Sequence, residues 1–374
     1  MKKILLLGAA FATIVLAWCW VQNAPQVKTV KIWVISPLSG PASTYGIDGV
    51  NAYKYVVDAY NAHTTWIHID LIIEDGKCDG KASTDAAQKL IQIDQVNMIM
   101  ITSCSGPAVA ASKVAQDAKT TTIVSLAVAP SISDIGDYVF RYPNGADVGA
   151  KMATYARQHW KSISLLTEET ELCRSLKNII LKQYTWTIIK DISFESSEKD
   201  FDILAKQIAS SNADGLFLLT QSDATAISSI KSLATEWQLT KYKGNIVWFS
   251  VFWLSPFLKA VGDLSEWLLQ YNYGAMFNLP QSGKDFLNGF QKTYEIHSDP
   301  GYIIIFAESM KLITKAVSAW NTTSEQIKNY LDTITSDNKT EGLFGDYYFD
   351  ASGDVVSVPF HLQKITNGKL EFIE

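Results

Sequence analysis

The stretch KIWVISPLSGPASTYGIDGVNA, Lys31 to Ala52, decides the fold class of this chain. It begins as an apolar β-rich run, passes through a turn rich in Ser, Gly and Pro, and continues as a helix from about Tyr45. A strand, a turn and a helix in this order form the repeating unit of a parallel α/β sheet. Trp33 stands in the middle of the strand, where an indole is hard to accommodate, and the pattern alone does not explain it.

The same alternation continues along the chain. The β-rich runs IHIDLIIED, NMIMIT and TTIVSL are separated by helical stretches, and a second series of the same kind begins after Arg141. A polar stretch from Ser324 to Lys339 then precedes a β-rich tail. No flexible linker separates the two series. We therefore predict an α/β fold with two lobes, several chain crossings and a ligand-binding cleft between the lobes.

Length, charge and composition exclude several classes of function. With 374 residues the chain is too long for one ordinary core. Its 32 Lys and Arg and 38 Asp and Glu give a net charge of −6, and no basic run could follow a nucleic-acid backbone. The five histidines lack metal-ligand spacing, and neither a phosphate-binding loop nor a nucleophile elbow occurs. We expect no enzyme, no cofactor, no metal and no nucleic-acid partner.

Residues 1–26 have the pattern of an export signal. Two lysines precede the apolar run Ile4 to Trp20, which is shorter than the about 20 residues of a membrane span. The sequence Leu16-Ala17-Trp18-Cys19 is similar to the lipobox of bacterial lipoproteins, although Trp18 breaks its pattern. We predict lipidation of Cys19 and a short tether up to residue 26. A plain signal peptide or an uncleaved anchor is the alternative.

Several motifs occur in order along the chain. They are PLSGPASTYGIDGVNA, EDGKCDG, TSCSGPAVAAS, DYVFRYPNGADVGAKMATYA, DFDILAKQI with ADGLFLL, and GDYYFDASGDVVSVPFHLQKITNGK. With them the sequence resembles, from about Val30 to Phe372, the branched-chain amino acid binding proteins of ABC importers, which have the type I periplasmic-binding (Venus-flytrap) fold. The resemblance implies two lobes, each a mostly parallel sheet flanked by helices, with three hinge crossings. It places residues 27–145 and 276–354 in lobe 1, and residues 146–275 and 355–374 in lobe 2.

Two of the four cysteines match the half-cystines of this family. These are Cys78 and Cys104, and the resemblance implies a disulfide between them, as suits an exported protein. Two buried thiols are the alternative. Cys173 is left over as an odd thiol, and a free cysteine near the cleft is favoured over its pairing with Cys104.

The resemblance also implies the ligand site of lobe 1. Ser105 and Gly106 open a helix after the second half-cystine, and their amides with the helix dipole would receive a carboxylate. An ordinary N-cap serine would fit the same sequence. Tyr45 matches an aromatic residue that flanks the ligand, and Ala127 and Val128 match its backbone contacts. A Thr typical of that segment is missing, which weakens the expectation of an identical carboxylate site.

Lobe 2 departs further from the family. Leu172 and Cys173 replace a usual Tyr-Gly pair, and Ser250 stands where the family often has the acid that holds an α-ammonium group. Glu171 or Glu308 could substitute for that acid, although a solvated charge is the plainer interpretation of each. Tyr302 is a candidate wall of the pocket and could equally belong to the core.

The predicted function is therefore that of an exported, lipid-anchored and monomeric receptor. It would bind a small amino acid or related carboxylated metabolite, close around it, and be recognised in the closed form by an ABC permease in the membrane. The same fold also serves as the ligand-binding part of sensors for amino acids or amides. The gene for a neighbouring permease or for a neighbouring regulator would distinguish these two functions.

The positions of the 11 tryptophans are unusual for this family, and Trp33 is one of them. Many of them stand where this family has glycine, and the 21 glycines are fewer than the usual share of about 7% would give. Our hypothesis is that most or all of them are UGA codons that the source organism reads as glycine. Genuine tryptophans in a divergent receptor are the alternative. The positions compared are Trp18, Trp33, Trp66, Trp160, Trp186, Trp237, Trp248, Trp253, Trp267 and Trp320.

Overall fold

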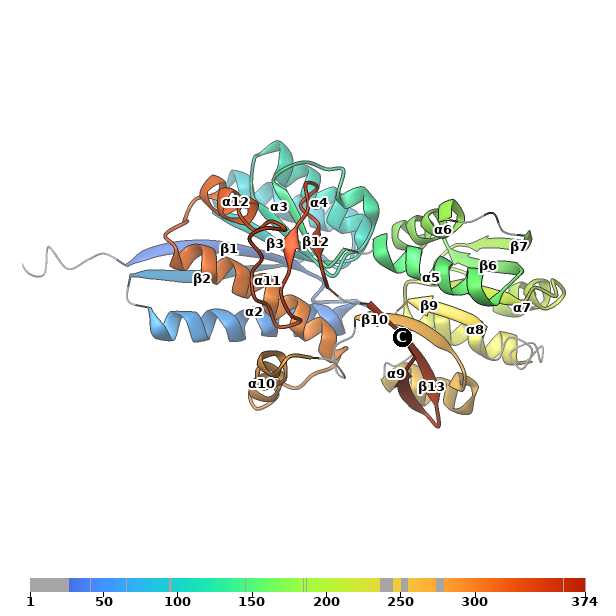
Figure 1. Cartoon of the computed structure of the whole chain (residues 1–374). Coiled ribbons are helices and arrows are strands. Elements are labelled where there is room, and N and C mark those ends of the chain that lie inside the picture. The colour runs from blue at the N-terminus through green and yellow to red at the C-terminus, as the bar shows by residue number, and fades with distance from the viewer. Residues whose placement is uncertain are drawn as a thin grey trace, which may run out of the picture.

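The fold was analysed in a computed structural model, which shows two α/β lobes side by side (Figure 1). Each lobe is a mostly parallel sheet flanked by helices, as predicted. The structure describes residues 27–40, 42–64, 66–93, 96–144, 146–183, 185, 187–235, 245–249, 255–273, 279–358 and 360–373. The predicted signal segment with Cys19, and Ser250, lie outside the described residues.

The lobe 1 sheet has five parallel strands in the order β2-β1-β3-β4-β5. β1 lies inside this sheet, and six of its nine residues are buried because helices cover both faces. Buried strands of a parallel sheet are apolar along their whole length, which is the pattern of the opening stretch. The strands are β1 (Lys28–Ser36), β2 (Ile67–Asp75), β3 (Met98–Thr102), β4 (Thr122–Ser125) and β5 (Val139–Tyr142).

The lobe 2 sheet has seven strands in the order β14-β13-β10-β9-β8-β6-β7. Its strands run parallel from β7 to β10, and β13 and β14 form an antiparallel edge. The strands are β6 (Ser162–Glu168), β7 (Thr187–Phe194), β8 (Gly215–Leu219), β9 (Ile246–Phe249), β10 (Leu269–Tyr273), β13 (Phe360–Thr366) and β14 (Lys369–Phe372).

The helices cover both sheets. Lobe 1 carries α2 (Ser43–His63), α3 (Gly80–Gln92), α4 (Ser105–Asp117), the short 3-10 helix η1 (Pro130–Ile132), α10 (Gln281–Phe290), α11 (Pro300–Ser318) and α12 (Ser324–Asp332). Lobe 2 carries α5 (Ala146–His159), α6 (Glu171–Gln183), α7 (Phe201–Ala209), α8 (Asp223–Thr235), α9 (Ser255–Val261) and the 3-10 helix η2 (Gly262–Ser265).

The chain passes between the lobes at three places. The first lies between β5 and α5, and the second between β10 and α10. The third follows the small two-stranded sheet of β11 (Tyr348–Phe349) and β12 (Val355–Val356), which bridges to β5 through Arg141 and Asp354 before the chain enters β13. Three distant parts of the sequence therefore run between the lobes where they join (Figure 1).

The polar stretch from Ser324 to Lys339 contains an element that the periodicity did not indicate. Its first part forms α12, which starts in a capping box in which Thr323 and Gln326 bond each other's backbone amides. The helix is held by Ile327 and Leu331, both fully buried. The remaining part of the stretch is irregular and ends in isolated β-bridges.

Candidate functional site

The lobe 1 half of the candidate site begins at the end of β3. Cys104 is the N-cap of α4 and forms a disulfide with Cys78, whose Cα lies 5.4 Å from that of Cys104. The predicted pairing is therefore present. The hydroxyl of Tyr45, in the first turn of α2, lies 2.9 Å from the Cys104 sulfur, and burial raises the pKa of Tyr45 so that it stays a neutral phenol. The disulfide thus fixes the start of α4 beside Tyr45.

Ser105 does not act as the helix cap. It is the first residue of α4, it is 3% exposed, and its Oγ accepts a hydrogen bond from the Ala129 amide at 3.3 Å. The alternative of an ordinary N-cap serine is therefore wrong. Because the hydroxyl oxygen is the acceptor in that bond, its own hydrogen can still be donated to a ligand.

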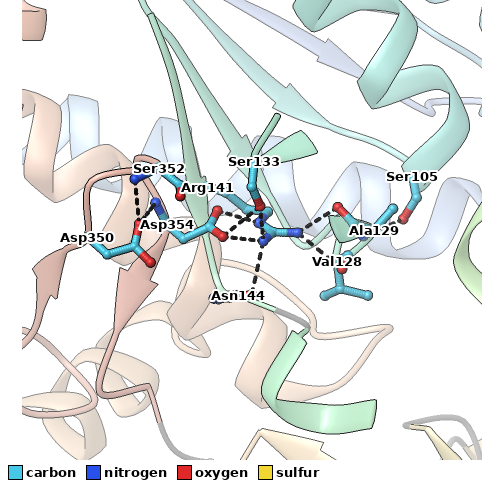
Figure 2. A network of polar contacts seen from close by, with 9 residues as sticks. All are labelled: Ser105, Val128, Ala129, Ser133, Arg141, Asn144, Asp350, Ser352 and Asp354. Atoms are coloured by element: carbon cyan, nitrogen blue, oxygen red, sulfur yellow. Dashed lines mark hydrogen bonds and ion pairs between the residues drawn. The ribbon is translucent and has the colours of Figure 1, made fainter. Parts of the chain in front are cut away.

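The segment after β4 carries Ala127 and Val128, and both are almost completely buried. It starts at Leu126, whose φ of 76° lies in the left-handed region that a branched residue rarely adopts. The guanidinium of Arg141 holds the end of this segment, because Nη1 donates to the carbonyls of Val128 at 3.2 Å and Ala129 at 2.6 Å (Figure 2). Backbone strain of this kind persists where the surroundings fix the conformation.

Lobe 2 approaches this region with the N-terminus of α6. Glu171 is the first residue of that helix, and its Oε1 accepts a hydrogen bond from Ser131 of lobe 1 at 2.8 Å. A Cβ built on Gly106 would lie 3.8 Å from the Cβ of Glu171. The structure thus brings Ser105, Gly106 and Glu171 together at the surface where the lobes meet. Arg174 lies 3.6 Å from the other oxygen of Glu171.

Other predicted residues have different surroundings. Glu308 is completely buried in lobe 1, where it accepts hydrogen bonds from the Leu343 amide and the Tyr347 hydroxyl, both at 2.8 Å. Its role as a substitute for the ammonium-binding acid is therefore not supported. Tyr302 is half-buried in the first turn of α11 and packs against the core. Cys173 is a free, buried thiol, and burial raises its pKa.

Residues that the sequence did not single out also gather here. Ser131 contacts Glu171, and Arg141 and Asp354 form a buried ion pair behind the 126–129 segment. Buried hydroxyls without a partner stand at the carboxyl ends of parallel strands in both lobes. They include those of Ser103 after β3, Tyr142 at the end of β5, Thr167 near the end of β6, and Thr220 after β8. Unsatisfied buried hydroxyls are unusual, and these can donate hydrogen bonds to a solute between the lobes.

The two helix N-termini give the two halves of the site opposite charge preferences. The start of α4 offers backbone N–H groups, the Ser105 hydroxyl and the positive end of the helix dipole, all of which favour an anion. The start of α6 offers the Glu171 carboxylate, which favours a cation or a hydrogen-bond donor. Among the described residues no group of His, Cys, Asp and Glu side chains could hold a metal ion.

A groove of about 550 Å³ lies elsewhere, between α2 and α11 on lobe 1. Its walls include Tyr55, Trp66 and Trp320. None of the residues that line it belongs to the inter-lobe site, so it is not part of that site. No helix among the residues that the structure describes is long and apolar enough to cross a membrane.

Two α/β lobes that face each other with the carboxyl ends of their strands, joined by three crossings, define a bilobal ligand-binding protein. The chain belongs to the periplasmic binding protein family, whose model matches residues 29–369. Members of this family bind solutes and are not enzymes, and they function with ABC transporters outside the cytoplasm.

Curated relatives and solved structures agree with this membership. The chain is 22% identical over 205 residues to the Leu/Ile/Val-binding protein of Escherichia coli K12, covering 52% of this chain and 56% of the relative. The Citrobacter freundii protein of the same name is 23% identical over 206 residues, with the same coverage. The chain thus spans about half the length of the curated relatives it matches.

The fold is also similar to solved structures along most of its length. The isoleucine complex of LivJ from Streptococcus pneumoniae has a TM-score of 0.80 at 19% identity, covering 92% of this chain and 99% of that one. A solute-binding protein of R. palustris in complex with 4-hydroxybenzoate has a TM-score of 0.81 at 19% identity, covering 93% and 96%. These similarities show the fold alone.

Proposed function

We propose that this chain is the extracytoplasmic solute receptor of an ABC importer and that it binds a small carboxylated solute between its lobes. The observation that carries the proposal is the meeting of the two helix N-termini, with Ser105 and Gly106 of α4 on one side and Glu171 of α6 on the other. A solute that touches both sides would hold the lobes together, because it interacts more strongly with the closed arrangement than with the open one.

The carboxylate of the solute would lie at the start of α4. The amides of Ser105 and Gly106 and the Ser105 hydroxyl would donate to it, and the helix dipole would stabilise its charge. Tyr45, Ala127 and Val128 would line the rest of this half. Tyr302 and Ser250 remain proposed members of the site, the latter outside the described residues.

The opposite end of the solute would meet Glu171. In the present structure this carboxylate accepts from Ser131 of lobe 1 at 2.8 Å and so links the lobes directly. A bound ammonium or hydroxyl group would take over that acceptor and replace the direct link with one through the ligand. Closure would then depend on the solute, as an importer requires of its receptor.

Solved structures with this fold include a complex with an amino acid, isoleucine, and a complex with an aromatic acid, 4-hydroxybenzoate. We favour an amino acid, because Glu171 supplies an acid for the ammonium group. The test is isothermal titration calorimetry of the mature protein with leucine, isoleucine, valine, benzoate and 4-hydroxybenzoate. Glu171→Gln should weaken amino acid binding by about tenfold or more and leave benzoate binding within about twofold.

The control variant is Glu169→Gln. Glu169 is a neighbouring acid that pairs with Arg174 inside lobe 2, so this change should leave all affinities unaltered. Equal loss from both variants would indicate a general electrostatic effect and contradict the assignment of Glu171. Failure of the whole panel to bind would contradict a carboxylated solute of this size.

The location and assembly of the receptor follow from the same proposal. We infer that residues 1–26 direct export, that Cys19 carries the lipid, and that lobes 1 and 2 have the bounds given above, except that β12 lies with lobe 1. The protein would act as a monomer that delivers solute to membrane permease subunits. Cys19→Ala should abolish incorporation of a labelled fatty acid, and unchanged labelling would refute lipidation at this residue.

A further inference from the structure

The first inference concerns Arg141, which no ligand needs to touch. This residue is 1% exposed and forms a paired ion bridge with Asp354, with Nε to Oδ1 at 2.7 Å and Nη2 to Oδ2. Ser133 joins the pair, since it donates to Asp354 and accepts from Nη2, both at 2.7 Å. Asn144 accepts a further bond from Nη2 at 2.9 Å. The guanidinium is thus held by three different parts of the chain (Figure 2).

These partners lie where the chain leaves lobe 1. Asn144 follows β5 at the first crossing, and Asp354 precedes β12, after which the chain crosses for the third time. The loop that carries Asp354 is itself fixed, because the Asp350 carboxylate accepts from the amides of Ser352 and Asp354. One buried charge pair therefore joins the beginnings of two hinge crossings.

The remaining nitrogen of Arg141 faces the site. Nη1 donates to the carbonyls of Val128 and Ala129, and the Ala129 amide donates in turn to Ser105 at 3.3 Å. The same segment includes Leu126, which is held in the left-handed region. A planar guanidinium with several fixed donors can bridge a carboxylate and two carbonyls at once, which the single ammonium of lysine cannot do.

We propose that Arg141, set by Asp354, is a positioning residue that couples the hinge crossings to the ligand-contacting segment 126–129. The functional consequence of this coupling rests on the proposed function, because segment 126–129 affects activity only if the ligand binds there. Its physical content can be tested without any ligand.

The experiment is hydrogen exchange of the mature protein followed by mass spectrometry, in the absence of solute. The variants are Asp354→Asn, which keeps the shape of the side chain and removes its charge, and Arg141→Lys. We expect exchange of the amide of Ala129, and of the amides around Arg141, to accelerate by about tenfold or more. The milder variant Ser133→Ala should give a smaller acceleration of exchange at the same amides. It replaces the first two variants in the test if they do not fold.

Glu308→Gln is the matched control. Glu308 is as buried as Asp354 and lies in the same lobe, but its hydrogen-bond partners, the Leu343 amide and the Tyr347 hydroxyl, lie outside the segment. A general loss of stability would accelerate exchange equally in the control and in the test variants. Unchanged exchange at Ala129 in Asp354→Asn, or equal change in Glu308→Gln, would overturn the proposal, whereas a lack of solute binding would affect only the proposed function.

A second and independent inference concerns the tryptophans. Trp267 and Trp320 have φ angles of 75° and 64°, in the region that glycine occupies without cost and that bulky residues rarely adopt. At the end of α11 the amide of Trp320 bonds the carbonyl of Val317, and the amide of Asn321 bonds that of Ala316. This is the Schellman pattern of a helix end, and Trp320 occupies its left-handed position, where glycine predominates.

Trp33 is unfavourable for another reason. It lies between β2 and β3, opposite Ile72 and Ile99, and is 1% exposed, and its indole N–H has no hydrogen-bond partner. Tryptophan normally pairs this group when it is buried. Trp160 differs, since its indole donates to Asn245 at 3.1 Å and its ring lies over Gly215, so its surroundings suit an indole.

We propose that positions 33, 267 and 320 are glycine in the natural protein and that their codons are UGA, read as glycine by the source organism. The test is to read these three codons in the gene and to measure the masses of the corresponding peptides from the native protein. UGA codons with glycine masses are expected. UGG codons, or UGA codons with tryptophan masses, would overturn the proposal, and neither outcome depends on solute binding.

Discussion

Trp320 gives the clearest stability prediction, because alanine and glycine variants separate backbone strain from loss of the indole. Both Trp320→Ala and Trp320→Gly remove a ring that is 61% exposed, so they lose the same partial burial. They differ in that alanine keeps a Cβ at a φ of 64°, which costs about 1 to 2 kcal/mol. Glycine avoids this cost but loses about 0.5 to 1 kcal/mol of chain entropy. The glycine variant should therefore be the more stable by about 0.5 to 1 kcal/mol.

The assay is urea unfolding of mature protein made from a gene with UGG at every tryptophan position. For a slope of about 3 kcal/mol/M, the midpoint of the glycine variant should exceed that of the alanine variant by about 0.2 to 0.3 M. Ile93 at the end of α3 is the control, because it is 72% exposed and its φ is −99°. There alanine should be at least as stable as glycine. The same order of stability at both positions would refute the argument from backbone strain.

Three further changes have definite expected results. Replacing Cys78 and Cys104 by alanine should lower the free energy of unfolding by about 3.5 kcal/mol, given their separation of 26 residues, and a midpoint unaffected by reductant would contradict this. The hydrogen bond and charge of buried Asp48 raise the pKa of His297 above its usual 6.5. Protonated His297 therefore stabilises the fold fully below about pH 6.5, and this stabilisation is lost as the pH rises through the raised pKa. Unfolding free energy should thus fall as the pH rises above about 6.5 through the raised pKa of His297, and this part of the slope should be absent in His297→Gln. Trp33→Phe removes the unpaired N–H and should cost less than about 1 kcal/mol, against about 3 to 5 for truncating a buried tryptophan, as thermal unfolding would measure.

The fold was predictable because most of its strands and helices differ in period. Runs such as NMIMIT are too short and too uniformly apolar for amphipathic helices, and they became the buried strands of two parallel sheets. α12 was missed because its apolar residues, Ile327 and Leu331, are few among polar neighbours. The capping box of Thr323 and Gln326 was nevertheless present in the sequence and could have indicated it.

The site was only partly predictable. Ser105, Gly106 and Glu171 each follow a strand of a parallel sheet. Their meeting at the carboxyl ends of the strands could therefore be predicted from the order of strands and helices in the sequence. The pairing of Arg141 with Asp354 is not local, because 213 residues separate the partners and only the third crossing brings them together. Equally, no pattern in the sequence distinguishes Glu308, which is bonded inside lobe 1, from an acid that faces a ligand.

Two residues with positive φ, Leu126 and Trp320, have different surroundings, and the difference connects the two inferences. Leu126 has a φ of 76° and lies in a segment that a buried arginine, an ion pair and a serine hydroxyl all hold in place. Its surroundings can hold the strain, and the strain coincides with the site. Trp320 has a φ of 64° at a helix end outside the site, where the backbone bonds of the cap hold the turn and the ring lines the groove between α2 and α11. Because glycine is the residue that this helix-end conformation favours, the strain at Trp320 is better explained by a different residue than by a function.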